Sequence, residues 1–305
     1  MINSQTNFNS NSNSFQDISS GSARPGSVQN MLSLFGRAAM KTDVFNIEQS
    51  VPPLRCTLDN VRIDVNHLKA YQALLGFKRL EVLPATYLNM LAFPSALMIM
   101  TDSRFPMKAM GQIHLANSVS VHKCFPLTSC IRLSTSVVGT EITASGAEWT
   151  LQMSAEIDGE LVWSSTSKML HRCNTGVPRR PVEDIFRSES PEIWSLDGGL
   201  GRRYAKVSGD FNPIHLSTMS AKAFGFKSAI AHGMWSKARC LVALEEELPD
   251  QGYSVAANFR KPLFLPSDVM FHRGKQNNRT FFSLFNSSGQ LAHLDGYITE
   301  DIDNA

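Results

Sequence analysis

One acid, one amide, one proline and one imidazole lie within six residues of this chain, in the stretch GDFNPIH at 209–215. Gly209-Asp210 is typical of a tight turn, and Asn212-Pro213 is typical of a helix start. The pattern predicts a helix over 213–223, with Asp210 and His215 at its N-terminal end. A helix dipole there favours an anionic Asp210 and a neutral His215, so the two groups are candidates for general acid and base.

The same stretch also fits a purely structural interpretation, in which Asp210 and Asn212 only cap free N–H groups. The residue types alone leave both interpretations open. A metal site is not expected, because no third and fourth ligands follow at the spacing of a zinc or di-iron centre. A Ser-His-Asp triad is not expected either, because the chain contains no GxSxG stretch around Ser208.

The composition is that of a globular protein with a large core. Apolar residues make up 43% of the 305 residues and charged residues 18%, which excludes the disordered class for most of the chain. A net charge of +2 is too small to indicate nucleic acid or an anionic membrane as the main partner. Five cysteines without CxxC spacing indicate free thiols in a reducing compartment, and we expect a cytoplasmic protein.

Four regions must position the candidate residues. Residues 1–35 begin with an Asn- and Ser-rich stretch that predicts a disordered tail, and this stretch lacks the pattern of a secretory signal. Residues 36–175 and 197–305 have the composition of two folded units. Residues 176–196 contain three prolines and predict a linker on the surface.

The two units share an internal pattern. Each contains a Gly-Phe-Lys tripeptide, at 76–78 and 225–227, and an apolar helical pattern begins eight residues after the glycine, at Pro84 and Gly233. About four strand-like segments follow in each half, separated by Gly, Asn, Asp and Pro. The shared spacing predicts a repeat of the α+β class, in which each unit is one long helix and a meander-like sheet curled around it.

This repeat allows the two halves to be compared residue by residue. A shift of 149 residues (225 minus 76) aligns Asp210 with Val61, Asn212 with Ile63 and His215 with Asn66. In an ungapped alignment the first half therefore lacks both the acid and the imidazole, and we expect one active site per chain. The apolar stretch 82–100 contains two prolines and several polar residues, which favours a buried helix over a membrane span.

Ten positions over 204–221 resemble the signature of the MaoC-like, (R)-specific enoyl-CoA hydratase family, also called hydratase 2. They are Tyr204, Val207, Ser208, Gly209, Asp210, Asn212, Pro213, Ile214, His215 and Ala221. The stretches AHGM at 231–234 and FRKPLFLPSD at 259–268 are also similar to the family. The resemblance is close over 200–300 and implies a double hot-dog fold: two curved antiparallel sheets, each wrapped around a long central helix, with a degenerate N-terminal unit.

The resemblance also implies the reaction and the roles of individual residues. The family hydrates trans-2-enoyl thioesters to (3R)-hydroxyacyl thioesters without a cofactor. Asp210 and His215 take the roles of general acid and base, and Asn212 orients the water or the pair. The backbone N–H of Gly233 then faces the thioester oxygen, where one such donor contributes about 2.7–4 kcal/mol.

Several further residues are candidates for binding the substrate. His232 and Met234 flank Gly233, although a structural role for His232 is the stronger interpretation. Arg260 and Lys261 are candidates for contacts to the phosphates of CoA or of an acyl carrier, and a solvated strand face is an equal alternative; Arg202 and Arg203 are weaker candidates. Five methionines either line an acyl tunnel or form ordinary core: Met90, Met98, Met100, Met107 and Met110.

Three functions remain in view. The first is hydration or dehydration of an enoyl thioester carried by CoA or by an acyl carrier protein. The second is thioester hydrolysis, which other hot-dog proteins perform, and the third is a non-catalytic acyl-thioester binding module. We expect no nucleic-acid partner and no stable membrane insertion. Both a single chain and a homodimer of double hot-dog chains are compatible with the sequence.

Overall fold

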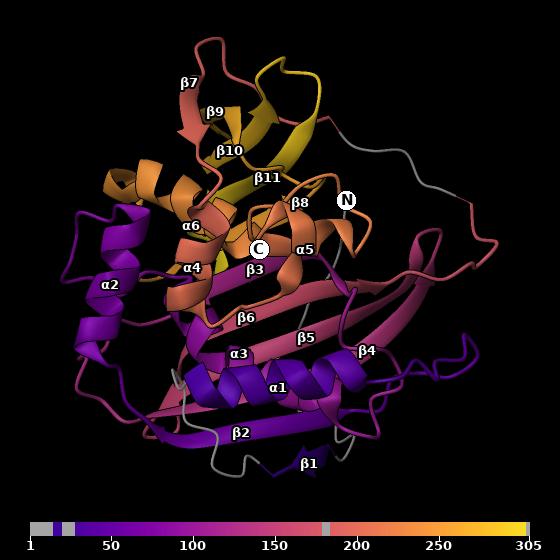
Figure 1. Ribbon diagram of the computed structural model, residues 1–305. Helices are drawn as coiled ribbons and strands as arrows, with labels where there is room; N and C mark the ends of the chain where they lie inside the picture. The colour runs from indigo at the N-terminus through magenta and orange to yellow at the C-terminus, as the bar shows by residue number, and fades with distance from the viewer. Residues whose placement is uncertain (1–14, 20–27, 179–183, 303–305) are drawn as a thin grey trace.

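The computed structural model describes residues 15–19, 28–178 and 184–302, and its core is one sheet of eleven strands (Figure 1). The strands of the N-terminal half are β1 Gln16–Ile18, β2 Leu54–Val61, β3 Ile113–Val121, β4 Ile131–Thr143, β5 Gly146–Ile157 and β6 Glu160–His171. Those of the C-terminal half are β7 Glu192–Leu196, β8 Tyr253–Phe259, β9 Ser267–Gln276, β10 Arg279–Asn286 and β11 Ala292–Thr299. All neighbouring strands run antiparallel except β1 and β2, which are parallel.

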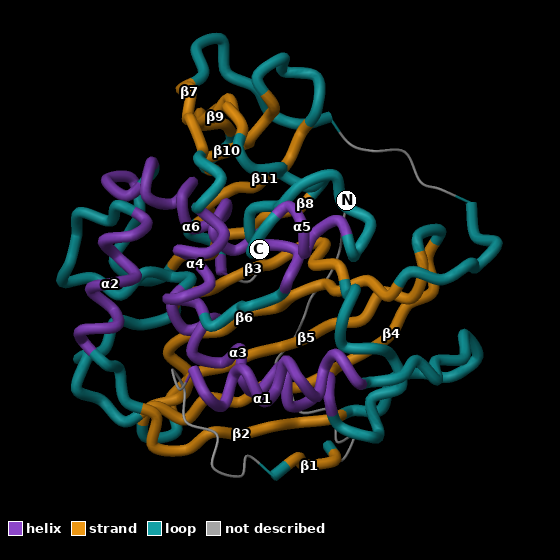
Figure 2. Tube along the Cα trace, viewed as in Figure 1, coloured by secondary structure: helices purple, strands orange, loops and turns teal. Residues whose placement is uncertain are grey.

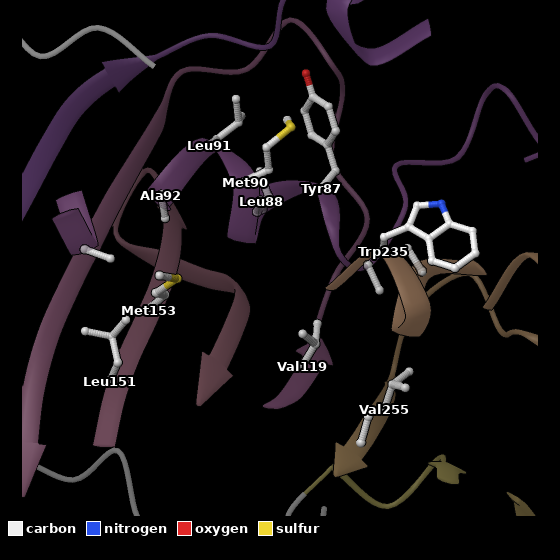
Figure 3. Close-up of a cluster of buried hydrophobic side chains, with 14 of the residues drawn as sticks. Tyr87, Leu88, Met90, Leu91, Ala92, Val119, Leu151, Met153, Trp235 and Val255 are labelled. Carbon is white, nitrogen blue, oxygen red and sulfur yellow. The ribbon is translucent and has the colours of Figure 1, made fainter. Parts of the chain in front are cut away.

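The order of the strands is the same in both halves when it is read outward from the middle of the sheet. One half runs β3-β6-β5-β4-β2 and the other runs β8-β11-β10-β9-β7. The halves meet where β3 and β8 pair, with Val119 opposite Val255 (Figure 3). The α+β class and the double hot-dog architecture are therefore confirmed, with one correction: the two expected sheets are joined into one continuous sheet.

Alternating apolar residues explain why these segments form strands that bury one face. In β4, Ile131, Leu133, Thr135 and Val137 are buried, while the residues between them are exposed or half-buried. This two-residue period places one face of the strand on a core and the other toward solvent. Each of the eight segments that the sequence indicated as strands overlaps one of β3 to β6 and β8 to β11, although the segments at 118–125 and 253–264 run past the ends of β3 and β8.

Each half folds around one central helix, α3 Tyr87–Thr101 or α6 Gly233–Ala243. In α3, 13 of the 15 residues are buried, because the helix lies against β2, β4 and β5 while another helix, α1 Val28–Met40, covers it from outside (Figure 2). A helix enclosed in this way needs no polar face. The start expected at Pro84 is wrong by three residues, because Thr86 is the N-cap and a turn over Pro84 precedes it.

A buried polar chain connects the two central helices across the middle of the sheet. Lys237 of α6 is fully buried, and its Nζ donates hydrogen bonds to Asn117 Oδ1 at 2.6 Å and to the carbonyls of Asn117 and Val255 at 3.0 Å. Asn117 Nδ2 in turn donates to Ser165 Oγ at 2.8 Å, and so does Asn89 Nδ2 of α3. Three acceptors saturate the three donors of the Lys237 ammonium group, which offsets part of the cost of burying it.

Two boundaries expected from the sequence are wrong. Within the segment 1–35, β1 and the first turns of α1 are ordered elements, and residues 1–14 and 20–27 lie outside the described residues. Within the expected linker 176–196, residues 192–196 form β7, which pairs with β9. Among the described residues, no helix is both long and apolar enough to cross a membrane, and all five cysteines are free thiols.

Candidate active site

The candidate acid lies at the end of a short helix, α4 Leu200–Ser208. Gly209 ends this helix with φ +72°, a left-handed conformation that glycine adopts without strain. The chain reverses there and leads into Asp210. The Asp210 Oδ1 atom accepts a hydrogen bond from the Asn212 N–H at 3.1 Å, so the turn itself orients the carboxylate.

Asn212 caps the next element, as the sequence predicted. Its Oδ1 accepts from the Ile214 N–H at 3.4 Å, and Pro213 begins a 3₁₀ turn, η1 Pro213–His215. The single helix expected over 213–223 is wrong. Ser217 has extended backbone and caps a separate short helix, α5 Thr218–Lys222, by accepting from the Ser220 N–H. The break after His215 fixes that histidine at the end of η1 instead of inside a longer helix.

The imidazole of His215 is oriented by the backbone. Its Nδ1–H donates to the Ile230 carbonyl at 2.8 Å, and only 9% of the residue is exposed. With the proton on Nδ1, the lone pair of Nε2 is available to accept a proton. This is the state that a general base requires.

A second histidine lies against the first. The ring of His232, the N-cap of α6, stacks on the ring of His215 with 3.7 Å between centroids and 25° between planes. Its Nε2–H donates to the Asp210 carbonyl at 3.0 Å and lies 3.9 Å from Asp210 Oδ2. The structure therefore places His232 beside both Asp210 and His215. This position supports the structural interpretation of His232, because its ring holds the acid's backbone and the base's ring together.

Burial controls the protonation of this cluster. It raises the pKa of Asp210 above its usual value, and the neighbouring His215 opposes this shift. Burial also lowers the pKa of His215 and, more strongly, that of His232, whose pKa is further lowered by His215. His215 is therefore neutral at neutral pH, as expected. The expected effect of the helix dipole on Asp210 is outweighed, because burial disfavours its anion.

Asp210, His215 and His232 each offer one ligand-type atom, and these three atoms lie within 4.8 Å of one another. Their geometry nevertheless does not suit a shared metal ion. A metal lies close to the plane of each imidazole that binds it. Two rings stacked face to face at 3.7 Å cannot both satisfy that requirement with one ion. The cluster is better suited to moving protons.

Gly233, the first residue of α6, has a backbone N–H without a partner inside the helix. A Cβ at this position would lie only 3.0 Å from Cδ1 of Phe259, so the ring of Phe259 occupies the space beside the glycine. The segment before Gly233 pairs with the loop after β8: Ala231 N–H donates to the Leu263 carbonyl at 2.8 Å. This pairing explains why AHGM and FRKPLFLPSD lie together.

The remaining predicted residues have different surroundings. Arg260 follows β8 and does not lie in it, and its guanidinium forms a two-point ion pair with Asp295. Lys261 is exposed and Met234 is half-buried in the first turn of α6. Of the five methionines, Met90 lines a cavity, whereas Met100 and Met107 are buried in the core and Met98 and Met110 pack against it.

Sequence reasoning missed two residues that shape this region. Gly201 of α4 packs so closely on His215 that a Cβ would lie 2.0 Å from the His215 carbonyl oxygen. Lys237 lies one turn after Gly233, and its charge together with burial lowers the pKa of the nearby His114 to about 4, with burial the larger cause. A single Gly or Lys in a helical pattern gives no signal of such a position.

The first half contains a related but incomplete arrangement. Asp64 caps α2 Val65–Leu75 as Asn212 caps η1, and Gly76 ends α2 with φ +91°. By strand order, α2 follows β2 as α4 follows β7, and Gly209 ends α4 with φ +72° as Gly76 ends α2. That the first half lacks both the acid and the imidazole stays a prediction.

Comparisons with known proteins place these observations in context. Residues 200–288 match the family model of the MaoC like domain. The chain is 29% identical to 3-hydroxyacyl-thioester dehydratase X of Mycobacterium tuberculosis over 276 residues, 89% of this chain and 97% of that protein. It is 26% identical to the mitochondrial 3-hydroxyacyl-[acyl-carrier-protein] dehydratase of Arabidopsis thaliana over 34% of this chain and 68% of that protein. The crystal structure of HtdX of Mycobacterium tuberculosis aligns with a TM-score of 0.71 at 26% identity, covering 80% of this chain and 99% of that one.

Proposed function

We propose that this chain is a MaoC-like dehydratase that reversibly hydrates a trans-2-enoyl thioester, carried by CoA, to a (3R)-hydroxyacyl thioester. The match of residues 200–288 to the family model of the MaoC like domain supports this proposal. The names of the two dehydratase relatives support a 3-hydroxyacyl thioester as the substrate class. The observation that carries the proposal is the juxtaposition of Asp210, His215 and His232 within 4.8 Å, next to the first turn of α6.

The chemistry begins with one water held between Asp210 and His215. His215 Nε2 accepts a proton from the water as its oxygen attacks Cβ of the enoyl group. Asp210 in its protonated form, which burial favours, delivers a proton to Cα. The product gains one OH at Cβ and one H at Cα. Transfer of the proton from His215 back to Asp210 through solvent then restores the starting state.

Negative charge develops on the thioester oxygen during this addition. The N–H of Gly233 at the start of α6 is the donor that faces this oxygen in our proposal, with the positive end of the helix dipole behind it. A side chain at Gly233 would meet the ring of Phe259, so this close packing favours glycine at the first position of α6. Met234 contributes to binding in the same turn.

The phosphates of the carrier are assigned to Lys261, whose side chain is exposed, and to Arg260. The ion pair with Asp295 holds the Arg260 guanidinium in place, which limits how far it moves toward a ligand. We therefore expect different effects from the two side chains: loss of Lys261 raises KM, whereas loss of Arg260 also leaves Asp295 with only the hydrogen bond from Asn258 Nδ2.

Two substitutions test the assignment of the acid and base. Asp210→Asn and His215→Ala remove one proton carrier each, and we expect each to reduce kcat by about 10²–10⁴-fold with the fold intact. The assay follows the loss of ultraviolet absorbance of crotonyl-CoA and longer enoyl-CoAs, with chiral analysis of the product. Asp59→Asn is the matched control, because Asp59 is an exposed acid in β2. Near wild-type turnover by either variant would show the roles to be wrong.

The alternatives give different outcomes in the same assay. A thioesterase releases the free thiol of CoA and forms no hydroxyacyl product. A non-catalytic module binds the enoyl-CoA without turnover in either direction. The measurement of free thiol, hydroxyacyl product and binding on one sample separates the three functions.

A further inference from the structure

Helix α1 belongs to neither hot-dog unit, yet it reaches the candidate active site. It lies outside α3, and its buried residues Met31, Leu34 and Ala38 recur at helical spacing on one face (Figure 1). Leu32, the next residue after Met31, is 56% exposed. Helix α1 precedes β2 in the N-terminal half, whereas no helix precedes the corresponding strand β7 in the described residues between β6 and β7. The helix is therefore an addition to the repeated architecture.

Met31 of this helix packs directly on the turn that carries the candidate acid. Its Cγ, Cε and Sδ atoms lie 3.4, 3.7 and 3.9 Å from the point that a Cβ on Gly209 would occupy. Gly209 precedes Asp210, and only 3% of Met31 is exposed. Met31, near the start of the chain, thus packs against the residue that directly precedes the proposed acid Asp210.

A small cavity lies at this contact. Its volume is about 30 Å³, which is close to the space of one water molecule in the liquid. Its walls come from four helices, α1 to α4, and include Met31, His67, Met90, Leu91, Pro94, Ser208 and Gly209. Figure 3 shows Met90 and Leu91 extending from α3 on the side away from Met153 of β5, and both side chains are buried.

The shape and chemistry of this cavity match the part of the substrate that lies beyond Cβ. The acyl chain must leave the Asp210–His215 pair on an apolar path, and this cavity is mostly apolar and adjoins the Asp210 turn. Two of its walls are methionines, whose flexible side chains adapt to the shape of a ligand. A volume of about 30 Å³ accommodates little more than one methylene, so a long chain does not fit while Met31 keeps its position.

We propose that the acyl chain of the substrate enters the cavity between α1, α3 and α4, and that Met31 closes it and limits the length of chain that the enzyme accepts. This inference rests on the proposed hydration of enoyl thioesters. It assigns the choice of short chains to a helix outside both hot-dog units. Met31 is a specificity-determining residue, and the catalytic groups are unchanged by it.

The test compares chain-length profiles of full-length variants. Met31→Ala removes three side-chain atoms and opens the cavity, and Met31→Phe fills it with a stiffer ring. Leu32→Ala is the matched control, because it truncates the exposed neighbour on the same helix. Each purified variant is assayed for kcat/KM with crotonyl-CoA, octenoyl-CoA and dodecenoyl-CoA, after circular dichroism confirms its fold.

We expect the wild type to prefer crotonyl-CoA. Met31→Ala raises the ratio of octenoyl-CoA to crotonyl-CoA efficiency by about tenfold or more, and Met31→Phe lowers that ratio, because a methylene in an apolar pocket is worth about 10–200-fold. Leu32→Ala keeps the wild-type ratio. The inference is overturned if the folded Met31 variants share the wild-type profile, and the proposed function then still stands because crotonyl-CoA is hydrated. A wild type that hydrates none of the three substrates overturns both. If Met31→Ala does not fold, the Met31→Phe profile decides alone.

Discussion

Gly201→Ala is the sharpest test of how the candidate base is positioned. Gly201 lies in the first turn of α4, and a Cβ there would lie 2.0 Å from the carbonyl oxygen of His215 and 3.1 Å from its carbonyl carbon. Contacts of a Cβ below 3.0 Å are essentially never seen. One methyl group therefore forces the backbone of His215 and the helix α4 apart by at least about 1 Å.

The size of the effect follows from this displacement. A misplacement of about 1 Å at a reacting group costs on the order of 10²-fold in rate. That factor corresponds to about 2.7 kcal/mol of transition-state stabilisation. Either way of relieving the contact disturbs the site, because moving η1 shifts His215 and moving α4 shifts Tyr204, whose ring lies 4.9 Å from that of His232. We expect kcat for crotonyl-CoA hydration to fall by about this factor, with a smaller change in KM.

The control is the same chemical change where there is room for it. Gly139→Ala adds a methyl group with no other atom within 4 Å and leaves the site untouched, so its kcat matches the wild type. Alanine is also the better helix former, so intrinsic propensity in α4 favours Gly201→Ala by up to about 1 kcal/mol. A folded Gly201→Ala variant whose kcat lies within a factor of about three of the wild type would refute the reasoning, because close packing on His215 would then not position the base.

Two further predictions concern protonation and the contact between the units. For pH, His215 acts as the neutral base and burial lowers its pKa below 6.5, so its protonation should give an acidic limb of the kcat/KM profile below pH 6.5. Asp210 acts as the protonated acid, and burial raises its pKa above 3.8, so its ionisation gives the basic limb. The unfolded chain protonates His215 before the folded chain as pH falls below 6.5, so His215 contributes a loss of stability there, and an acidic limb above pH 7 would contradict this assignment. For the contact between the units, the buried carboxylate of Glu245 accepts hydrogen bonds from the N–H groups of Lys78 and Arg79. Glu245→Ala should therefore lower the free energy of unfolding, measured in urea, by about 1–3 kcal/mol relative to the exposed control Glu246→Ala. Equal free energies of unfolding for the two variants would contradict this role of Glu245.

Much of the fold could be predicted because the strands and the repeat produce local patterns of apolar residues in the sequence. Alternating apolar residues indicated eight strands, and the repeated Gly-Phe-Lys tripeptide indicated two similar halves. The leading strands β2 and β7 were missed, because a short strand at a sheet edge, or one preceded by proline-rich sequence, has a weak periodic signal. The joining of the two halves through β3 and β8 depends on long-range pairing, which no local pattern encodes.

The candidate site also contains some features that the sequence predicts and others that it does not. Asp210, Asn212 and His215 follow from a short stretch in which turn and cap residues have local meanings. The stacking of His232 on His215 and the contact of Gly201 with His215 bring together residues separated by more than ten positions. Close packing between elements determines these contacts, and a single sequence records only the residue types that permit them.

The C-terminal unit, which carries the proposed site, is structurally incomplete without the N-terminal unit. The donors of Lys237, one turn after Gly233, are satisfied in part by Asn117 of β3, and Glu245 anchors the loop that follows α2. The apolar wall beside Gly209 comes from α1 and α3 of the N-terminal half. A C-terminal unit alone would expose β8, leave the buried amine of Lys237 without two of its three acceptors, and open the site to water.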